Sequence, residues 1–405
     1  MDQRLVQQPL STGRRRNRLR CGNALRSVLV LGVTLAACLQ GGCKTEPTWP
    51  LWEAYTRSAF DPQGRIVDHS AGDRTTSEGQ AYGMFFALVA NDRLRFDKLV
   101  HWTEDNLAGG DLTLRLPAWS WGKAPDGTWK MLDQNPASDA DLWMAYALLE
   151  AGRLWHDPRY EKMGTAMAAR IAQQEVALVP SLGATLLPGP QGFHPDAGTW
   201  ILNPSYLPPS VLSYMATTFP HGPWGAVLAS VPMMLTQGSG NGFAMDWLTA
   251  GGSVRPAAYP IQHPAGAQAG QAIGSYDAIR VYLWLGIADP ETPGVQASLA
   301  GLGGMAEQLK RHTAPPEKVD ESGASLNGDG PVGFSAAVVP YLHALNMRSE
   351  EKRQTERMSA MKDPATGLYG RNASYYDQNL ALFANGWLEQ RYRMDRQGQL
   401  KLKWR

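Results

Sequence analysis

Apolar residues recur at three- and four-residue spacing along most of the chain after residue 48, which is the period of an amphipathic helix. Clear examples run from 77 to 91 and from 139 to 155. The same pattern predicts further helices near 162–174, 209–218, 224–236, 275–288, 298–311, 333–345, 350–361 and 375–391. Because strand-like alternation is scarce, the pattern predicts an all-α protein.

The C-terminal tail departs from this helical pattern. Residues 392–404 alternate about Gln397-Gly398, which favours a short hairpin there. Neither an internal repeat nor a low-complexity linker divides the chain after residue 43, so we expect one domain over 44–405. Ten or more helices without a repeat favour a closed toroid of helices over a solenoid.

The first 43 residues have a different character. Seven arginines lie within residues 1–26, and an apolar run of about a dozen residues follows, shorter than the roughly 20 that a membrane-spanning helix needs. A basic stretch before a short apolar run is typical of a secretory signal peptide. The run ends in Leu35-Ala-Ala-Cys38, which resembles a bacterial lipobox and makes Cys38 a candidate lipidation site. Ordinary cleavage near Gly42, which would give a soluble exported protein, is the alternative.

Charge and cysteine placement narrow the chemistry further. Without residues 1–26 the net charge is −5, which argues against nucleic acid as a partner because phosphate binding needs a basic face. All three cysteines precede residue 44, so the rest of the chain has no disulfide, thiolate nucleophile or cysteine metal site. The eight histidines show no metal-ligand spacing. We therefore expect neither a metal nor a cofactor.

Aromatic residues are frequent, with 14 Trp and 14 Tyr, and several lie in two long loops. Residues 107–136 carry Trp119, Trp121 and Trp129, and residues 180–204 carry further aromatics. Long loops in a compact domain tend to be functional. Flat aromatic faces stack on sugar rings, although packing over the helical core explains the same residues equally well.

Three acidic residues open predicted helices, each one or two positions after a serine: Glu78, Asp139 and Asp277. We expect the serines to be N-caps, and Gln80 to complete a capping box in the first helix; the serines are Ser77, Ser138 and Ser275. Each acid taken singly is explained by the helix dipole, which favours a negative charge in the first turn.

Together, the three acids suggest more than dipole compensation. If their helices are parallel members of a toroid, the N-termini converge and the carboxylates face one cleft. Clustered carboxylates push one pKa upward, so that one group keeps its proton while others stay ionised. Glycoside hydrolysis uses such a pair as acid and base. The helix dipole lowers a carboxylate pKa, however, so burial near Tyr82 or a neighbouring carboxylate has to outweigh it.

The segment 137–155 resembles the signature of glycoside hydrolase family 8 over its whole length. Residues 75–84 and 275–284 resemble the family segments that carry the general acid and the general base. The resemblance covers nearly all of 49–404 and is greatest to endoglucanases encoded with bacterial cellulose synthase. It implies that Glu78 is the general acid, Asp277 is the general base and Asp139 holds the sugar at the cleavage subsite.

The resemblance also implies an (α/α)6 barrel, inversion of configuration, a periplasmic location and β-1,4-glucan (cellulose) as substrate. The expected partner is the cellulose synthase and export complex, with membrane contact only through a lipid anchor. Candidates for sugar contact follow, each of which can equally be structural: Trp119, Trp121, Tyr206 and Tyr276 for stacking, and Asn203 and Arg280 for polar contacts. The alternatives are a non-catalytic glucan-binding subunit, or a family 8 enzyme for another β-glucan, chitosan or xylan.

Overall fold

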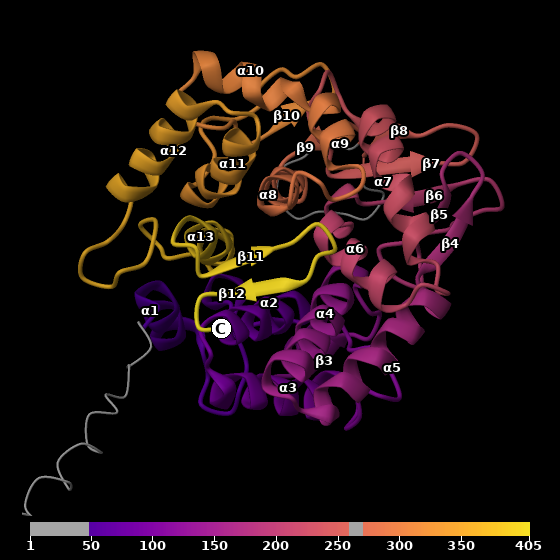
Figure 1. The fold of residues 1–405 in the computed structure, drawn as a ribbon, viewed down its shortest axis with the longest axis vertical. Helices are drawn as coiled ribbons and strands as arrows, with labels where there is room; N and C mark the ends of the chain where they lie inside the picture. Colours follow the sequence, from indigo (N-terminus) through magenta and orange to yellow (C-terminus); the bar gives the residue numbers. More distant parts are fainter. Residues whose placement is uncertain (1–47, 259–269) are drawn as a thin grey trace, which may run out of the picture. The chain divides into compact units, whose positions relative to one another are not determined.

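Helices of two kinds alternate along the chain (Figure 1). The computed structural model describes residues 48–258 and 270–405, so the leader and Cys38 lie outside the described residues. One kind of helix is buried on nearly all faces over most of its length: α2 (Ser77–Val89), α4 (Ser138–Trp155), α6 (Pro209–Thr218), α8 (Ile279–Ile287), α11 (Val332–Ala344) and α13 (Tyr375–Leu388). Helices apolar all round are expected in a protein interior.

The other helices bury one side and expose the rest: α1 (Pro50–Ala59), α3 (Arg93–Leu107), α5 (Pro158–Gln174), α7 (Trp224–Gly238), α9 (Val295–Gly301), α10 (Gly303–Arg311) and α12 (Arg348–Ala360). Figure 1 shows α3, α5, α10 and α12 at the periphery. Helix α3 packs outside α2, α5 outside α4 and α12 outside α11.

The six buried helices close into a ring. Helix α2 contacts α4 and α13, α11 contacts α8 and α13, and α6 contacts α4 and α8. Phe383 of α13 lies at the centre, with its ring centroid 5.0 Å from those of Tyr82 and Trp284 and 5.2 Å from those of Phe85 and Trp143. These aromatic contacts join four helices in one core. The arrangement is an (α/α)6 barrel, which confirms the expected fold.

Nine helices lie close to their predicted ranges, and the differences elsewhere have physical causes. The predicted segment 298–311 is interrupted at Leu302, which separates α9 from α10. Helices α1 and α3 were not predicted from the periodicity. Both bury only part of their surface and carry many polar residues, so their apolar stripe is narrow.

Short antiparallel strands lie between the helices, some of them within the predicted loops 107–136 and 180–204. They form one sheet of β1 (Thr75–Thr76), β2 (Ser120–Lys123) and β3 (Trp129–Asp133), and another of β6 (Trp200–Leu202), β7 (Trp247–Ala250) and β8 (Arg255–Ala257). A hairpin joins β4 (Val176–Val179) to β5 (Gly183–Leu186), and an antiparallel pair across α8, α9 and α10 joins β9 (Ile273–Gly274) to β10 (Val319–Asp320). These strands are short additions to a helical barrel, so the protein remains in the predicted all-α class.

The C-terminal hairpin is present as predicted, formed by β11 (Tyr392–Met394) and β12 (Leu400–Leu402). Its turn meets the second half of α4, where Tyr146 Oη donates to Gly398 O at 2.8 Å and Leu400 N donates to Glu150 Oε2 at 2.8 Å. The hairpin thus covers the barrel end away from the starts of α2 and α4. No helix within the described ranges is long and apolar enough to cross a membrane.

Candidate active site

Glu78 lies in the first turn of α2, at one end of the ring. The N-cap is Thr76, whose Oγ1 accepts from Gly79 N at 3.1 Å, so the prediction of Ser77 as cap was wrong by one residue. The capping box was also wrong, because the Gln80 amide is used inside the fold: its Oε1 accepts from Ile66 N at 2.7 Å. The start of α2 is therefore tied to the preceding loop as well as to its own cap.

Asp139 lies in the first turn of α4, beside Glu78. Ser138 was expected to cap this helix, but its Oγ donates to Leu187 O at 2.6 Å and Ala137 is the N-cap. Asp139 Oδ1 accepts from Ala140 N at 2.8 Å, and only 6% of its side chain is exposed. The carboxylate is thus fixed in the wall of the site.

Asp277 precedes its helix, because α8 begins at Ile279 and not near 275 as predicted. It lies in a turn whose flanking amides, Ser275 N and Ala278 N, both donate to Asp246 Oδ1 at 2.8 Å. Ser275 is therefore not a side-chain cap of α8; its own amide is held by a carboxylate from another segment. About 26% of the Asp277 side chain is exposed, which leaves it accessible to water.

Arg280 connects the three carboxylates. Its Nη2 donates to Asp277 Oδ1 at 2.8 Å, and its Nη1 lies 3.4 Å from Asp139 Oδ2 and forms an ion pair with Glu78. The guanidinium is nearly completely buried. Its fork geometry suits simultaneous contact with several carboxylates, and a buried charge persists only when it is paired in this way.

Burial shifts the proton affinity of two of these acids. Burial raises the pKa of Glu78, with a contribution from the negative charge of Asp277, while Arg280 and Tyr375 act in the opposite direction. Burial likewise raises the pKa of Asp139 to about 7, against the influence of Arg280. For Glu78, burial and the neighbouring carboxylate therefore outweigh the groups that favour its charged form, which is what a group that must keep a proton requires.

Tyr206 and Asn203 lie behind this cluster. The guanidinium carbon of Arg280 lies 5.5 Å from the centroid of the Tyr206 ring, a cation–π contact. Asn203 is fully buried, and its Oδ1 accepts from Ser205 Oγ at 2.7 Å. Ser205 Oγ in turn accepts from Arg280 Nη2 at 2.9 Å. Asn203 thus orients Arg280 through Ser205, and its predicted contact with a sugar stays a prediction.

Trp119, which directly precedes β2, and Trp121, which lies within β2, have different surroundings. Trp119 O accepts from Ser77 N at 3.0 Å, and the Arg74 guanidinium lies 5.6 Å from its ring, so this side chain is next to the start of α2. The ring of Trp121 stacks on Trp129 with centroids 5.1 Å apart and lies edge-on to Trp102. Trp119 is placed beside Glu78, whereas Trp121 belongs to an aromatic cluster of the β2–β3 hairpin.

Tyr276 is the exposed aromatic of the site, with 43% of the residue accessible. Its Oη donates to Glu317 Oε1 at 2.9 Å, and its ring lies edge-on to Phe334 at 5.1 Å. Tyr376 Oη donates to its carbonyl oxygen. The ring is therefore held next to Asp277 with part of its surface open, as a stacking platform needs.

The profile of the family described as Glycosyl hydrolases family 8 matches residues 29–390. The chain belongs to this family. It is 46% identical over 371 residues to an endoglucanase of Xanthomonas axonopodis pv. citri, which covers 91% of this chain and 93% of that protein. It is 41% identical over 385 residues to an endoglucanase of Escherichia coli K12, covering 94% and 98%.

Solved structures show the same fold. The endo-1,4-D-glucanase of Vibrio fischeri ES114 matches with a TM-score of 0.76 and 37% identity, over 88% of this chain and 99% of that one. As in other family 8 proteins, the scaffold here is a double ring of helices. The three acids named from the sequence thus lie at one end of a family 8 barrel.

Three further residues shape this family 8 site without having been given a role from the sequence. Tyr375 Oη donates to Glu78 Oε1 at 3.2 Å, Ser205 contacts Arg280, and Asp246 holds the Asp277 turn. The sequence did carry a signal for Tyr375. It follows a serine at the start of the last predicted helix, just as the three acids follow serines at the starts of theirs. Asp246 lies in a loop between predicted elements, where periodicity carries no information about its partners.

Proposed function

We propose that the protein is an endo-β-1,4-glucanase that hydrolyses internal bonds of cellulose by a single displacement with inversion. The observation that carries the proposal is the contact of Glu78, Asp139 and Asp277 with one arginine at one end of a family 8 barrel. In such a reaction one carboxylic acid protonates the leaving oxygen while a carboxylate activates water on the opposite face of the sugar.

Glu78 has the properties of the general acid. Burial and the charge of Asp277 raise its pKa, so that it retains a proton closer to neutral pH than an exposed glutamate does. The hydrogen bond from Tyr375 fixes one carboxyl oxygen, which directs the other toward Arg280 or a bound glycosidic oxygen. Proton donation then neutralises the charge that develops on the leaving sugar.

Asp277 has the properties of the general base. It is the most exposed of the three carboxylates, and its contact with Arg280 orients it while leaving its second oxygen for water. Asp139 is the most enclosed of the three, and we assign it to hydrogen bonding with the sugar at the cleavage subsite. Tyr276 and Trp119, placed beside Asp277 and Glu78, are the stacking surfaces that we assign to neighbouring sugars.

The relatives support the choice of substrate, since two that are 46% and 41% identical to this chain are named endoglucanases. We assign to this protein a role in bacterial cellulose biosynthesis, in contact with the synthase and export complex. We further propose that residues 1–43 are a leader and residues 44–405 one catalytic domain in the periplasm, either soluble or anchored through a lipid on Cys38.

Viscosity and reducing ends measured together test the proposal. We expect purified residues 44–405 to lower the viscosity of carboxymethylcellulose quickly at a small yield of reducing ends, because internal cuts shorten chains before they release many ends. Glu78→Gln should lower turnover by about 10²–10⁴-fold, the usual contribution of a general acid.

Glu150→Gln is the matched control, because Glu150 is a fully buried carboxyl that binds the C-terminal hairpin at the other end of the barrel. It should keep wild-type turnover at a temperature where it is folded. Full turnover by the Glu78 variant would overturn its role as acid. An inactive wild type that binds cellulose would favour the glucan-binding subunit, and activity confined to chitosan or xylan would reassign the substrate.

A further inference from the structure

The turn that carries Asp277 is held by a residue from a distant segment. Asp246 lies just before β7, and its Oδ1 accepts from both Ser275 N and Ala278 N at 2.8 Å. The backbone nitrogen of Asp246 donates to Ile273 O at 2.8 Å. These three hydrogen bonds bracket Asp277 on both sides, so the path of residues 273–278 is set by the position of Asp246.

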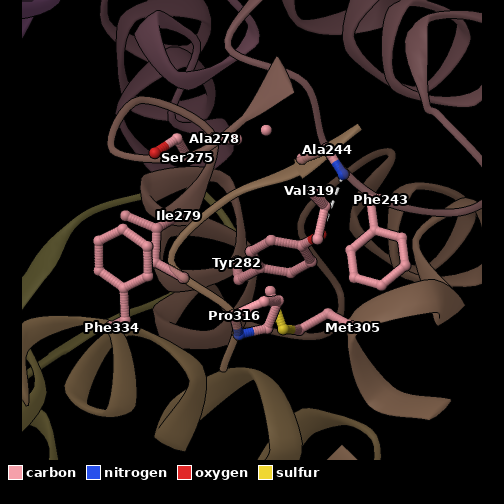
Figure 2. A pocket seen from close by; sticks show the side chains of 11 residues that line it. Phe243, Ala244, Ser275, Ala278, Ile279, Tyr282, Met305, Pro316, Val319 and Phe334 are labelled. Carbon is pink, nitrogen blue, oxygen red and sulfur yellow. Dashed lines mark hydrogen bonds between the residues drawn. The ribbon is translucent and has the colours of Figure 1, made fainter. Parts of the chain in front are cut away.

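The segment that contains Asp246 lies unusually close to this turn. A Cβ at Gly274 would collide with the carbonyl oxygen of Ala244, so only glycine permits the approach. The turn also borders a small apolar cavity, which residues of both segments line. Figure 2 shows Ser275 and Ala278 above Ile279, Tyr282 and Phe334 in the wall of that cavity.

The cavity wall also ties the two segments together. Tyr282 Oη of α8 accepts from Ala244 N at 2.9 Å, the dashed contact in Figure 2. From the opposite side, Ser275 Oγ donates to Glu317 O at 3.0 Å. Asp246 accepts from the amides of Ser275 and Ala278, on either side of Asp277. The hydrogen bonds of Tyr282 and of the Ser275 hydroxyl hold the neighbouring backbone and not these amides.

We propose that Asp246 is a positioning residue for the reaction: it fixes the turn so that the Asp277 carboxylate meets the attacking water. The inference rests on the proposed role of Asp277 as general base. A misplacement of about 1 Å in a reacting group can cost on the order of 10²-fold in rate, so the clamp acts on turnover more than on binding.

The chemistry of Asp246 makes the clamp unusual. It is a buried acid next to another acid, and burial together with the charge of Asp277 raises its pKa to about 7. One oxygen accepts both amide protons, and an asparagine oxygen has the same capacity. Geometry and charge can therefore be separated by substitution at this one position.

Three variants make that separation. Asp246→Asn keeps the acceptor and removes the charge, Asp246→Glu keeps the charge and moves the acceptor, and Asp246→Ala removes both. With carboxymethylcellulose as substrate, we expect kcat to fall by about 10–100-fold in the Glu and Ala variants, with KM within about threefold of wild type. The Asn variant should stay within about threefold of wild type in both constants.

Two further variants serve as references. Glu150→Ala removes a buried carboxyl that also accepts a backbone amide, here from the C-terminal hairpin far from Asp277, and should lower the melting temperature with little change in kcat. Asp277→Asn reports on the proposed base itself. If it retains turnover, the proposed function is at fault; if it is inactive while the Glu and Ala variants at Asp246 keep wild-type kcat, the clamp is refuted.

The pattern across Asp246 variants decides the remaining outcomes. Equal loss in the Asn and Glu variants would contradict a geometric clamp, because the Asn variant preserves the acceptor. Losses that disappear when each variant is assayed well below its own melting temperature would also overturn it. Should Asp246→Ala not fold, the contrast between the Asn and Glu variants still tests the inference.

Discussion

Arg280, in the first turn of α8, donates from Nη2 at 2.8 Å to Oδ1 of Asp277, which lies in the turn just before that helix. The same guanidinium forms an ion pair with Glu78 and lies 3.4 Å from Asp139. One cation thus fixes the relative positions of three acids, two from the first turns of α2 and α4 and one from the turn before α8. Without it, three carboxylates in a partly buried site would repel one another.

Arg280→Lys tests this organising role. A lysine keeps the charge but presents a single ammonium on a flexible stem, so it cannot contact three carboxylates at once. We expect kcat to fall by about 10²-fold, because the three acids lose the shared partner that fixes their relative positions. Steady-state kinetics on carboxymethylcellulose, with circular dichroism to verify folding, measure the effect; wild-type kcat in a folded variant would contradict it.

Tyr375→Phe should move the pH profile toward higher pH. The Tyr375 hydroxyl lowers the pKa of Glu78, so its loss raises that pKa and keeps the acid protonated to a higher pH. The basic limb of kcat/KM therefore shifts upward, with a loss of rate near tenfold or less at the optimum, as for removal of one hydrogen bond of roughly 0.5–1.5 kcal/mol. A downward shift would show that Tyr375 does not act on Glu78.

The helical part of this fold is readable from the sequence because burial leaves a periodic signature. Helix α6 lies at its predicted range of 209–218, and α4 begins one residue before the prediction. The three acids were found because each follows a serine near a helix start. The acids were located correctly even though Ser77 and Ser138 are not the N-caps. The true caps lie one residue earlier, so each acid is still in the first turn of its helix.

The contacts that organise the site were not readable, because they join residues far apart in the chain. Asp246 holds a turn about 30 residues later, and no local pattern marks such a bond. The late start of α8 has the same origin, because Asp246 holds the backbone from Ser275 to Ala278 in a turn. The strands around Trp121 escaped notice because two to five residues are too few for alternation to register.

A second pair of acids predicts how stability depends on pH. Asp141 and Glu175 are fully buried and face each other, and burial raises both pKa values well above their ordinary range. Two carboxyl groups hydrogen-bond to each other only while one keeps its proton. Because the folded-state pKa values exceed the unfolded ones, the pair stabilises the fold fully below about pH 4 and progressively less as the pH rises.

Glu175→Gln removes one of these titrations. We expect its free energy of unfolding to fall less steeply above pH 5 than that of the wild type, by up to about 1.4 kcal/mol per pH unit for each proton involved. Urea unfolding at several pH values provides the measurement, with the exposed Glu321→Gln as control. Parallel curves for wild type and Glu175→Gln would show that the pair does not titrate in this range.

The hairpin turn at Gly398 predicts a contrast between two glycines. Both Gly398 and Gly183 have a positive φ, of 76° and 78°, but only at Gly398 would a Cβ collide, with the carbonyl oxygen of Ser210. Gly183→Ala should cost about 1 kcal/mol from backbone strain alone, and Gly398→Ala clearly more. Denaturant unfolding compares them; equal losses would mean that the hairpin does not pack tightly on α6.

The configuration of the first product tests the central claim most directly, namely that Glu78 and Asp277 act by a single displacement. Proton NMR during the first minutes of hydrolysis of a soluble cello-oligosaccharide distinguishes the two anomers before mutarotation mixes them. Our account predicts that the α-anomer accumulates first, because water attacks the face opposite the leaving group of a β-linked chain. Initial accumulation of the β-anomer would require a covalent intermediate and would contradict the assignment of Asp277 as a base.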